Sequence, residues 1–420
     1  MKRTRFVAGT AAAVLVAAGC APNDSGQLAS SNDAVAAWPD GAIEVESDDA
    51  PSAETESVAA DAEGRVRAPA IDGRDFSEVD AIVAEFVDDR ELNGAGLAIV
   101  DADGMVHEEY WGEFDAERVS FVASSSKQLT AGVMLALQEQ GVLDVDETLP
   151  NIVGDAWGPD VPEITVAQMV SNTSGLVGAD PDPLYEPYLC QFVGDDLEEC
   201  GRIIATTPDD DADVIAPDTE YRYGGGQWQV AGAVAEFVSG KTWDELIQEV
   251  YRNPCGLDDS FGYNNQWGTL GAEGYEYPRD FDGDVSLLPP TDNPKVEGGA
   301  YLTVPDYATL LQLHLNGGSC PYGPVLSPES LEIMHADRAA AVWDGDAGSP
   351  NAGYGYGWRH HRDTNRLSDL GAYGSVPWLD LDAGYGVYLV IEEDARTGLD
   401  LKSEIEELVH DVMTADTPTA

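Results

Sequence analysis

A serine and a lysine three positions apart form the strongest candidate for a reactive site in this chain. Ser124 and Lys127 stand at the head of an apolar segment, residues 124–140, whose spacing predicts a helix that ends at Gly141. Residues three apart share one face of a helix, so the hydroxyl and the amine are expected to lie side by side. Only five of the 420 residues are lysine, and the placement of one of them beside a hydroxyl indicates a catalytic pair.

The chemistry that this pair predicts is nucleophilic attack by the serine. A serine hydroxyl is a poor nucleophile at neutral pH and needs a base beside it. A lysine amine acts as a base only when it is neutral, so we expect the pKa of Lys127 to be lowered by partial burial and by the helix N-terminus. The N–H groups of the first helical turn would also stabilise an oxyanion. The structural alternative for so short a motif is a serine N-cap followed by a solvated lysine.

The charge of the chain excludes several classes of partner. It has 78 Asp and Glu against 21 Lys and Arg, a formal net charge of −57. Such a surface repels nucleic acid and anionic lipid headgroups, so we expect neither as a direct partner. We interpret the excess as a solvated acidic surface rather than a cation-binding device.

The N-terminus predicts export. Residues 1–5 are basic and residues 6–18 are small and apolar, too few to span a bilayer as a mature helix. The run ends at Cys20 in a sequence that resembles a bacterial lipoprotein processing site. We therefore expect residues 1–20 to be a lipoprotein signal peptide and Cys20 to carry a lipid. This lipid would be the only membrane contact of a protein in the extracytoplasmic cell envelope; an ordinary signal peptide is the alternative.

The other cysteines fit an exported protein. Four of the five remain after Cys20 is set aside, and an even number predicts two disulfides. Cys190 and Cys200 bracket a short acidic loop and are expected to pair, which leaves Cys255 for Cys320. The sequence by itself allows three connectivities.

The pattern along the chain predicts an α+β fold. Residues 21–72 have no apolar periodicity and are interpreted as a disordered acidic tether, followed by one folded domain at residues 73–415. Strand patterns at both ends and helical patterns in the middle predict one antiparallel sheet flanked by helices, with a mostly helical region. The main elements expected are a helix near 76–86, a hairpin of 96–100 and 105–111, the 124–140 helix with Val133, Met134 and Leu137 on one face, strands 376–381 and 385–391, and a helix at 403–413.

Residues 121–143 resemble the active-site helix of the serine β-lactamase and penicillin-recognising family, which includes class C β-lactamases, D-alanyl-D-alanine carboxypeptidases and related esterases. In that family the first serine of a Ser-x-x-Lys motif is acylated and the lysine helps to deprotonate it, which assigns Ser124 and Lys127. The resemblance covers residues 76–412 and implies a β-lactamase/transpeptidase-like fold, with the active site in the cleft between sheet and helical region. The other matching segments are residues 142–147, 164–176, 298–307 and 354–358.

A second family motif, Tyr-x-Asn, has its counterpart at residues 223–225. By this resemblance Tyr223 would relay the serine proton to the leaving group. Gly225 stands where the family has asparagine. Tyr221 is a second tyrosine two residues earlier, but only Tyr223 has the family register. The structural alternative is that Tyr223 merely packs under the glycine turn.

A third family motif, Lys-Thr-Gly or His-x-Gly, has its counterpart at residues 369–371. By resemblance the N–H groups of Ala372 and Ser124 would form an oxyanion hole, and Gly371 would let substrate approach the strand. Asp369 stands where the family has a cation. It would repel a substrate carboxylate by roughly 1 kcal/mol or more, so we expect neutral or cationic esters and amides rather than efficient β-lactam hydrolysis.

Other reactive sites are absent from the sequence. There is no Gly-x-Ser-x-Gly elbow, no His-Glu-x-x-His spacing and no phosphate-binding glycine loop, so we expect no metal and no cofactor. The sequence predicts an exported serine hydrolase that forms an acyl-enzyme with a small-molecule or peptide substrate containing a carbonyl. The alternatives are a catalytically impaired binding protein of the same fold and a true β-lactamase or D-Ala-D-Ala carboxypeptidase.

Overall fold

The computed structural model describes residues 73–179, 185, 188–207, 213–265, 281, 283–285, 288, 291–346 and 349–415. The predicted signal peptide, Cys20 and the predicted tether lie outside these residues and stay predictions. The chain divides into two units, Met1–Ser57 and Val58–Ala420, and every described residue belongs to the second. Among the described residues, no helix is both long enough and apolar enough to cross a membrane.

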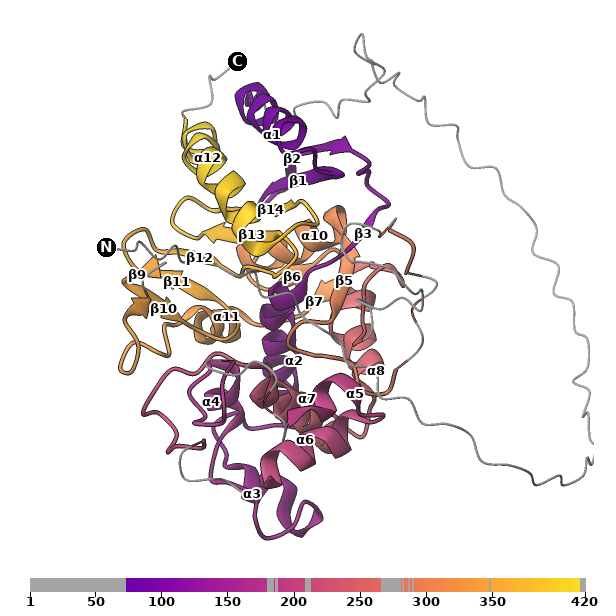
Figure 1. The fold of residues 1–420 in the computed structure, drawn as a ribbon, viewed down its shortest axis with the longest axis vertical. Coiled ribbons are helices and arrows are strands. Elements are labelled where there is room, and N and C mark those ends of the chain that lie inside the picture. Colours follow the sequence, from indigo (N-terminus) through magenta and orange to yellow (C-terminus); the bar gives the residue numbers. More distant parts are fainter. Residues whose placement is uncertain are drawn as a thin grey trace, which may run out of the picture. The chain divides into compact units, whose positions relative to one another are not determined.

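A seven-stranded antiparallel sheet, in the order β10-β11-β12-β13-β14-β1-β2, organises this unit. β1 (Gly94–Asp101) and β2 (Gly104–Gly112) form the predicted hairpin. β1 also pairs with β14 (Tyr385–Val390), so segments from both ends of the folded region are neighbours, as predicted (Figure 1). The remaining strands are β10 (Ala352–Tyr354), β11 (Arg359–His361), β12 (Arg366–Ser368) and β13 (Ser375–Asp380).

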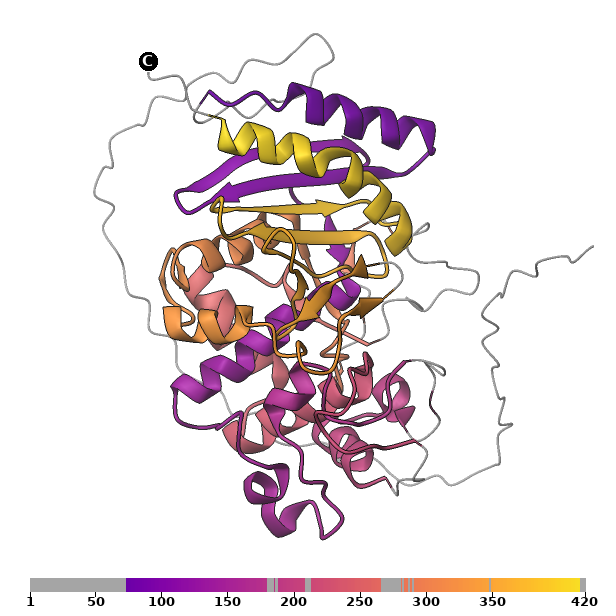
Figure 2. The same cartoon turned by 90° about the vertical axis from the view of Figure 1, so that its left-hand side faces the viewer.

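Helices cover both faces of the sheet. α1 (Ser77–Asp89) and α12 (Ala395–Thr414) pack on one face and α10 (Val304–Leu315) packs on the other (Figure 2). Successive side chains of a strand point to opposite faces, so in β13 Trp378 joins the core beneath α1 and α12 while Leu379 joins the core beneath α10. The whole of β13 is therefore buried. The α+β architecture predicted from the sequence is confirmed.

The C-terminal helix is longer than the sequence predicted. α12 begins at Ala395, because the carboxylate of Asp394 caps it by accepting the N–H groups of Arg396 and Thr397 at 2.8 and 2.9 Å. Gly398 obscured this start, since glycine is a poor helix former. A Cβ at Gly398 would lie 2.9 Å from a methyl group of Val376, so the glycine allows close packing of helix on sheet.

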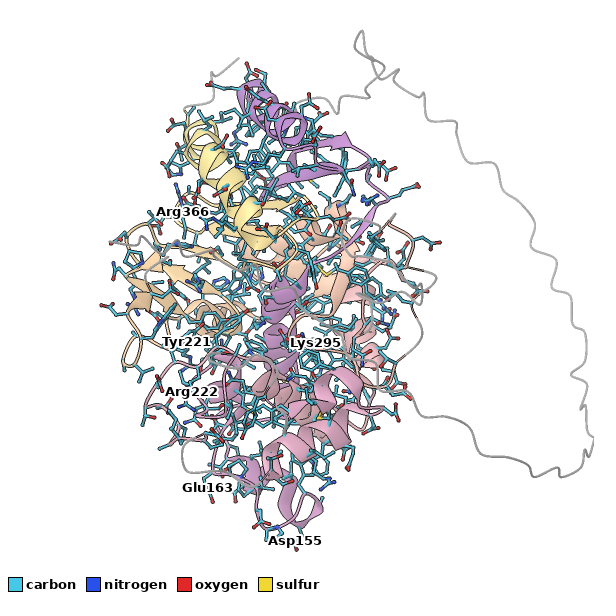
Figure 3. The ribbon with its side chains drawn as sticks, viewed as in Figure 1. Asp155, Glu163, Tyr221, Arg222, Lys295 and Arg366 are labelled. Atoms are coloured by element: carbon cyan, nitrogen blue, oxygen red, sulfur yellow. A yellow bond between two sulfur atoms is a disulfide. The ribbon has the colours of Figure 1, made fainter. Side chains whose placement is uncertain are left out.

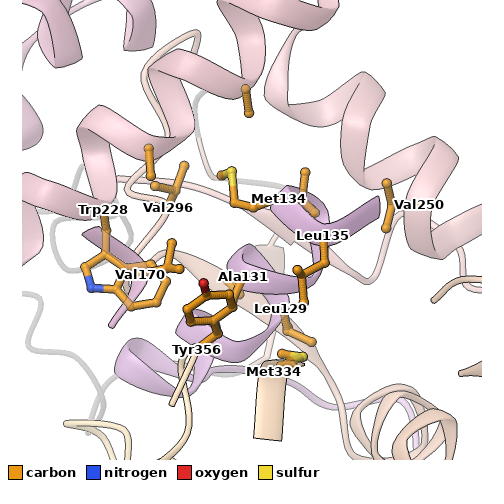
Figure 4. Close-up of a cluster of buried hydrophobic side chains, with 14 of the residues drawn as sticks. Leu129, Ala131, Met134, Leu135, Val170, Trp228, Val250, Val296, Met334 and Tyr356 are labelled. Carbon is orange, nitrogen blue, oxygen red and sulfur yellow. The ribbon is translucent and has the colours of Figure 1, made fainter. Parts of the chain in front are cut away.

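The helical region is built around α2 (Lys127–Glu139). Its residues from Lys127 to Leu137 are buried on every side, whereas the sequence predicted one apolar face. The difference arises because α2 packs against α4 (Val166–Val170), α7 (Gly225–Ser239) and α11 (Pro328–His335) at once. Figure 4 shows this core and labels Leu129, Ala131, Met134 and Leu135 of α2.

The other elements are short. A second sheet has the strand order β3-β5-β4 and lies beside the start of α2. The helices and helical turns are η1 (Ala123–Ser126), α3 (Leu149–Val153), η2 (Gly154–Ala156), α5 (Cys190–Val193), α6 (Leu197–Thr206), α8 (Trp243–Ile247), η4 (Gln248–Arg252) and α9 (Asn253–Cys255). The strands are β3 (Val119–Phe121), β4 (Gly262–Tyr263), β5 (Ala300–Thr303), β6 (Ser319–Cys320), β7 (Gly323–Pro324), β8 (Gly345–Asp346) and β9 (Ser349–Pro350).

Two disulfides join segments of this region. Cys190 is bonded to Cys200, with 5.4 Å between their Cα atoms, and ties α5 to α6. Cys255 is bonded to Cys320, with 4.7 Å between their Cα atoms, and ties the end of α9 to β6. The second bridge closes the longer loop, because its cysteines are 65 residues apart in sequence and those of the first are 10 apart.

Candidate active site

Ser124 lies in the turn η1, directly before α2. Ala123 has a φ of +45°, a left-handed conformation that is uncommon outside glycine and that here precedes the candidate nucleophile. The two following serines are buried and bonded to backbone: the hydroxyls of Ser125 and Ser126 donate to the carbonyls of Asp369 and Ala123, each at 2.6 Å. Ser124 is partly exposed and lines a cavity of about 420 Å³. The structure thus distinguishes Ser124 from its two neighbours.

Lys127 is fully buried and is held by one residue. Its Nζ donates to the backbone carbonyl of Glu297 at 2.9 Å and to Oε2 of the same residue at 2.8 Å. Nζ also lies 4.6 Å from the ring centre of Tyr223. Burial by itself lowers the pKa of Lys127, but Glu297, Tyr223 and Asp369 together raise it above its ordinary value. The expected lowering of this pKa is therefore wrong, because a carboxylate that the sequence did not reveal stabilises the ammonium.

Glu297 lies between two lysines. Its Oε1 accepts from Nζ of Lys295 at 2.9 Å, while its Oε2 faces Lys127. Burial raises the pKa of Glu297, yet the two ammonium groups outweigh burial and lower that pKa to about 2. Glu297 is thus a carboxylate throughout the neutral range. Figure 3 labels Lys295, which lies on the opposite side of α2 from Tyr221.

Sequence reasoning missed both Glu297 and Lys295. Glu297 directly precedes the glycine turn at residues 298–299, which the family resemblance had already singled out. Lys295 is one of five lysines in the chain, but unlike Lys127 it has no serine three positions before it. Both residues line the same cavity as Ser124.

Tyr223 and Gly225 also line this cavity. Tyr221 does not; its ring stacks on that of Trp343 with 4.2 Å between ring centres. The choice of Tyr223 over Tyr221 thus agrees with the geometry. A Cβ at Gly225 would lie 2.4 Å from Oε1 of Gln191 and 2.8 Å from Oε1 of Glu297. The space beside Gly225 is therefore filled by these two side chains.

The segment after β12 contributes less to the cavity than expected. Ala372 lines it together with Ser124, which suits a shared oxyanion hole. Gly371 does not line it: a Cβ there would lie 2.1 Å from the carbonyl oxygen of Val122. This glycine serves the close approach of two backbone segments, rather than the approach of substrate as predicted.

Asp369 is likewise not on the cavity wall. It is 5% exposed, and within the described part of the chain its Oδ2 has no hydrogen-bond partner. Burial raises the pKa of Asp369 well above its ordinary range, against the opposing effects of Lys127 and Arg359, and so favours the uncharged acid. The predicted repulsion of a substrate carboxylate by Asp369 therefore has no exposed charge to act through. Across the described residues, no group of three or more His, Cys, Asp or Glu side chains is arranged to hold a metal ion.

A large antiparallel sheet and a helical region with a serine at the head of the central helix define a β-lactamase/transpeptidase-like enzyme fold. Proteins of this kind are serine hydrolases and acyltransferases. The chain belongs to the Beta-lactamase family, whose model matches residues 79–407.

Individual relatives are distant. Penicillin-binding protein 4 of Amycolatopsis lactamdurans is 25% identical over 293 residues, which are 64% of this chain and 71% of that protein. The unliganded simvastatin synthase LovD from Aspergillus terreus matches with a TM-score of 0.61 and 18% identity, over 80% of this chain and 97% of that one. EstCE1, a hydrolase with promiscuous acyltransferase activity, matches with a TM-score of 0.62 and 19% identity, over 78% of this chain and 97% of that one. At these identities the two structural matches establish the fold alone.

Proposed function

We propose that this protein is a serine hydrolase that forms an acyl-enzyme on Ser124 with an ester or amide substrate. The observation that carries the proposal is that, of three consecutive serines, Ser124 alone lines the cavity. Ser125 and Ser126 are buried and bonded to backbone carbonyls, whereas Ser124 lines the cavity that also contains Tyr223 and Ala372. A hydroxyl placed in this way at the head of a helix suits nucleophilic catalysis.

The charge of Lys127 decides how the proton moves in this proposal. Glu297 keeps Lys127 as an ammonium, so Lys127 is not the resting base that the sequence suggested. Tyr223 relays the proton: as the Ser124 hydroxyl attacks the carbonyl carbon, the phenol oxygen accepts the Ser124 proton while the phenol O–H passes its own proton to the leaving alcohol or amine. The Lys127 ammonium lies 4.6 Å from the centre of the Tyr223 ring. In deacylation the phenol oxygen accepts a proton from the water that attacks the acyl carbon, while its own proton passes to Ser124.

The oxyanion of each tetrahedral intermediate would be held by backbone N–H groups. Ser124 is the second residue of η1, which continues into α2, and the first N–H groups of a helical segment have no acceptor within that segment. Ala372 lines the same cavity from the segment after β12. Donors fixed in backbone need no rearrangement when charge develops, which is what makes them effective in catalysis.

The cavity wall favours a substrate with an apolar group. Lys295 and Glu297 form an ion pair there, and much of the remaining wall is aromatic. The aromatic lining residues are Tyr185, Tyr188, Phe192, Tyr223 and Tyr373. Rings of this kind bind apolar acyl or alcohol groups. We therefore propose neutral esters or amides with an apolar substituent as the first substrate class.

A β-lactamase or D-Ala-D-Ala carboxypeptidase is the alternative activity of the same site. Asp369 gives no reason to exclude their carboxylate-bearing substrates, because it lies off the cavity wall and burial favours its neutral form. Lys295 on the wall provides a cation near such a carboxylate. The name of the relative Penicillin-binding protein 4 is consistent with this alternative.

A non-catalytic binding protein is the second candidate function. The observation that favours it is the ion pair of Lys127 and Glu297, which occupies two of the three ammonium protons. A panel of chromogenic esters, a cephalosporin and a D-Ala-D-Ala peptide separates the three possibilities. We expect hydrolysis of an apolar ester that is lost in Ser124→Ala and in Tyr223→Phe; binding of these compounds without any turnover would support the binding protein instead.

Export and anchoring are proposed from the N-terminus alone. Residues 1–20 have the basic start, apolar run and cysteine of a lipoprotein signal. A lipid on Cys20 would hold the protein in the bacterial cell envelope, with the acidic tether between membrane and enzyme. Mass spectrometry of the mature N-terminus tests this: an acylated Cys20 supports it, and an unmodified start further along the chain contradicts it.

A further inference from the structure

We propose that Glu297 is a positioning residue, which orients Lys127 as an ammonium toward the reacting groups, and that Gly225 provides the space it needs. The inference rests on the proposed function at Ser124. Nothing in the sequence indicated that Glu297 and Gly225 act together. Three observations support it: the hydrogen bonds of Lys127, the charges around it, and the volume beside Gly225.

Among the described residues, the hydrogen bonds of Lys127 leave one of its three N–H groups without an acceptor. An ammonium has three donors, and Glu297 accepts two of them, through its backbone carbonyl at 2.9 Å and its Oε2 at 2.8 Å. Both acceptors belong to Glu297, so this one residue fixes the orientation of the Lys127 ammonium. The orientation of the third N–H therefore depends on Glu297. The candidate catalytic residue beside it is Tyr223, whose ring centre lies 4.6 Å from Nζ.

The charges explain why Lys127 needs this anchor. A fully buried ammonium without a counterion is strongly disfavoured. The titratable groups that act on Lys127 are Glu297 before β5, Tyr223 before α7 and Asp369 after β12. Asp369 is buried with its pKa raised, so Glu297 is the dependable negative charge. Glu297 itself is held ionised by Lys127 and Lys295, and its charge also raises the pKa values of Tyr373 and Asp369.

The position of Glu297 requires that residue 225 has no side chain. A Cβ at this position would lie 2.8 Å from Oε1 and 3.0 Å from Cγ of Glu297, and 2.4 Å from Oε1 of Gln191. Contacts below 3.0 Å force a partner to move, and the partners here are the amide of Gln191 and the carboxylate group of Glu297, whose Oε1 binds Lys295 and whose Oε2 binds Lys127. Gly225 has no left-handed φ, so packing rather than backbone conformation accounts for the glycine.

The test is the rate at which a fluorophosphonate probe labels Ser124, measured from pH 6 to pH 10 in wild type and in Glu297→Gln. Glutamine keeps the shape and one acceptor but removes the charge that most strongly opposes the effect of burial, so the pKa of Lys127 falls. We expect an alkaline loss of labelling that begins within this pH range and at least about one pH unit below that of wild type. We also expect labelling at neutral pH to fall on the order of 10-fold, because Lys127 loses its fixed direction.

Controls separate the possible failures. Glu332→Gln removes an exposed carboxylate on α11 and should leave both the rate and the pH profile unchanged. Gly225→Ala is a second variant, for use if Glu297→Gln does not fold. It keeps Glu297 but crowds its side chain, and it should shift the pH profile of labelling in the same direction. Absence of labelling in wild type would refute the proposed function itself. Wild-type labelling with an unchanged profile in both variants, or faster labelling in Glu297→Gln, would refute only the role of Glu297.

Discussion

The hydroxyl of Ser125 donates a hydrogen bond to the backbone carbonyl of Asp369 at 2.6 Å. This bond joins the residue after the candidate nucleophile to the segment that carries Ala372. Ser375 extends the connection, since its hydroxyl donates to Ser125 Oγ at 3.1 Å. The two halves of the proposed oxyanion hole are thus fixed to each other by buried side chains of the nucleophile turn and of β13.

Ser125→Ala tests this connection. The substitution leaves the buried carbonyl of Asp369 without that donor, so we expect the free energy of unfolding to fall by about 1–3 kcal/mol. Denaturant unfolding measures the loss, and labelling of Ser124 should slow as well, because Ala372 and Ser124 are less firmly placed. Ser403→Ala, on the exposed face of α12, is the matched control and should change neither quantity. Equal stability of Ser125→Ala and wild type would show that the bond does not matter.

A double variant tests whether Gly225 and Glu297 compete for one volume. Gly225→Asn alone places a side chain 2.4–2.8 Å from Gln191 and Glu297 oxygens and should reduce ester hydrolysis. Glu297→Ala alone removes the anchor of Lys127 and should also reduce it. In the double variant, the new asparagine occupies the vacated volume and offers Lys127 an amide oxygen. We expect its activity to exceed that of either single variant, a coupling that double-mutant analysis of kcat/KM measures; losses that simply add would contradict it.

Glu236 predicts a pH dependence of stability that is separate from the active site. Burial, together with Asp196, Glu198 and Asp292, raises its pKa in the folded protein to about 7, while Trp243 N–H opposes the shift. Because the folded pKa lies above the unfolded one, Glu236 contributes stability below about pH 4.5 that is lost as the pH rises through 7.

We therefore expect Glu236→Gln to reduce the loss of unfolding free energy between pH 5 and pH 8. Chemical denaturation at the two pH values gives the difference directly. Glu332→Gln, which changes an exposed carboxylate, should retain the wild-type difference. The interpretation of Glu236 is wrong if the wild type and Glu236→Gln lose equal stability over this interval.

The two disulfides should contribute unequally. In the loop-entropy description, closing the 65-residue separation between Cys255 and Cys320 contributes about 4 kcal/mol, and the 10-residue separation between Cys190 and Cys200 about 3 kcal/mol. Thermal unfolding should thus show a larger decrease in Tm for Cys320→Ser than for Cys200→Ser. Peptide mapping without reduction checks the pairing first, and a peptide that links Cys190 to Cys255 would overturn it.

Much of the architecture could be predicted from the sequence because it depends on local patterns. The strand patterns at residues 96–100 and 105–111 predicted the β1–β2 hairpin, and the apolar spacing of residues 76–86 predicted α1. The start of α12 was missed because Gly398 interrupts the pattern for a reason that lies in the sheet, its contact with Val376. The sequence pattern of a helix or strand predicts its ends well only when packing against other elements does not decide which residues stand there.

The site was predicted unevenly for the same reason. Ser124 and Lys127 have a recognisable spacing, Tyr223 was assigned by the family resemblance, and the structure brings all three together. Glu297 has no such spacing: it is 170 residues from Lys127 and one of 78 acidic residues. The sequence also cannot show that Asp369 is buried away from the cavity, since burial depends on packing between distant segments.

The position of a covalent adduct identifies the nucleophile of this protein directly. The folded protein is treated with a fluorophosphonate probe, digested and analysed by mass spectrometry, with Ser124→Ala and Ser403→Ala treated in parallel. We expect one adduct, on Ser124, that is absent from Ser124→Ala and unchanged in Ser403→Ala. No adduct on the wild type, or an adduct that persists in Ser124→Ala, would contradict this expectation.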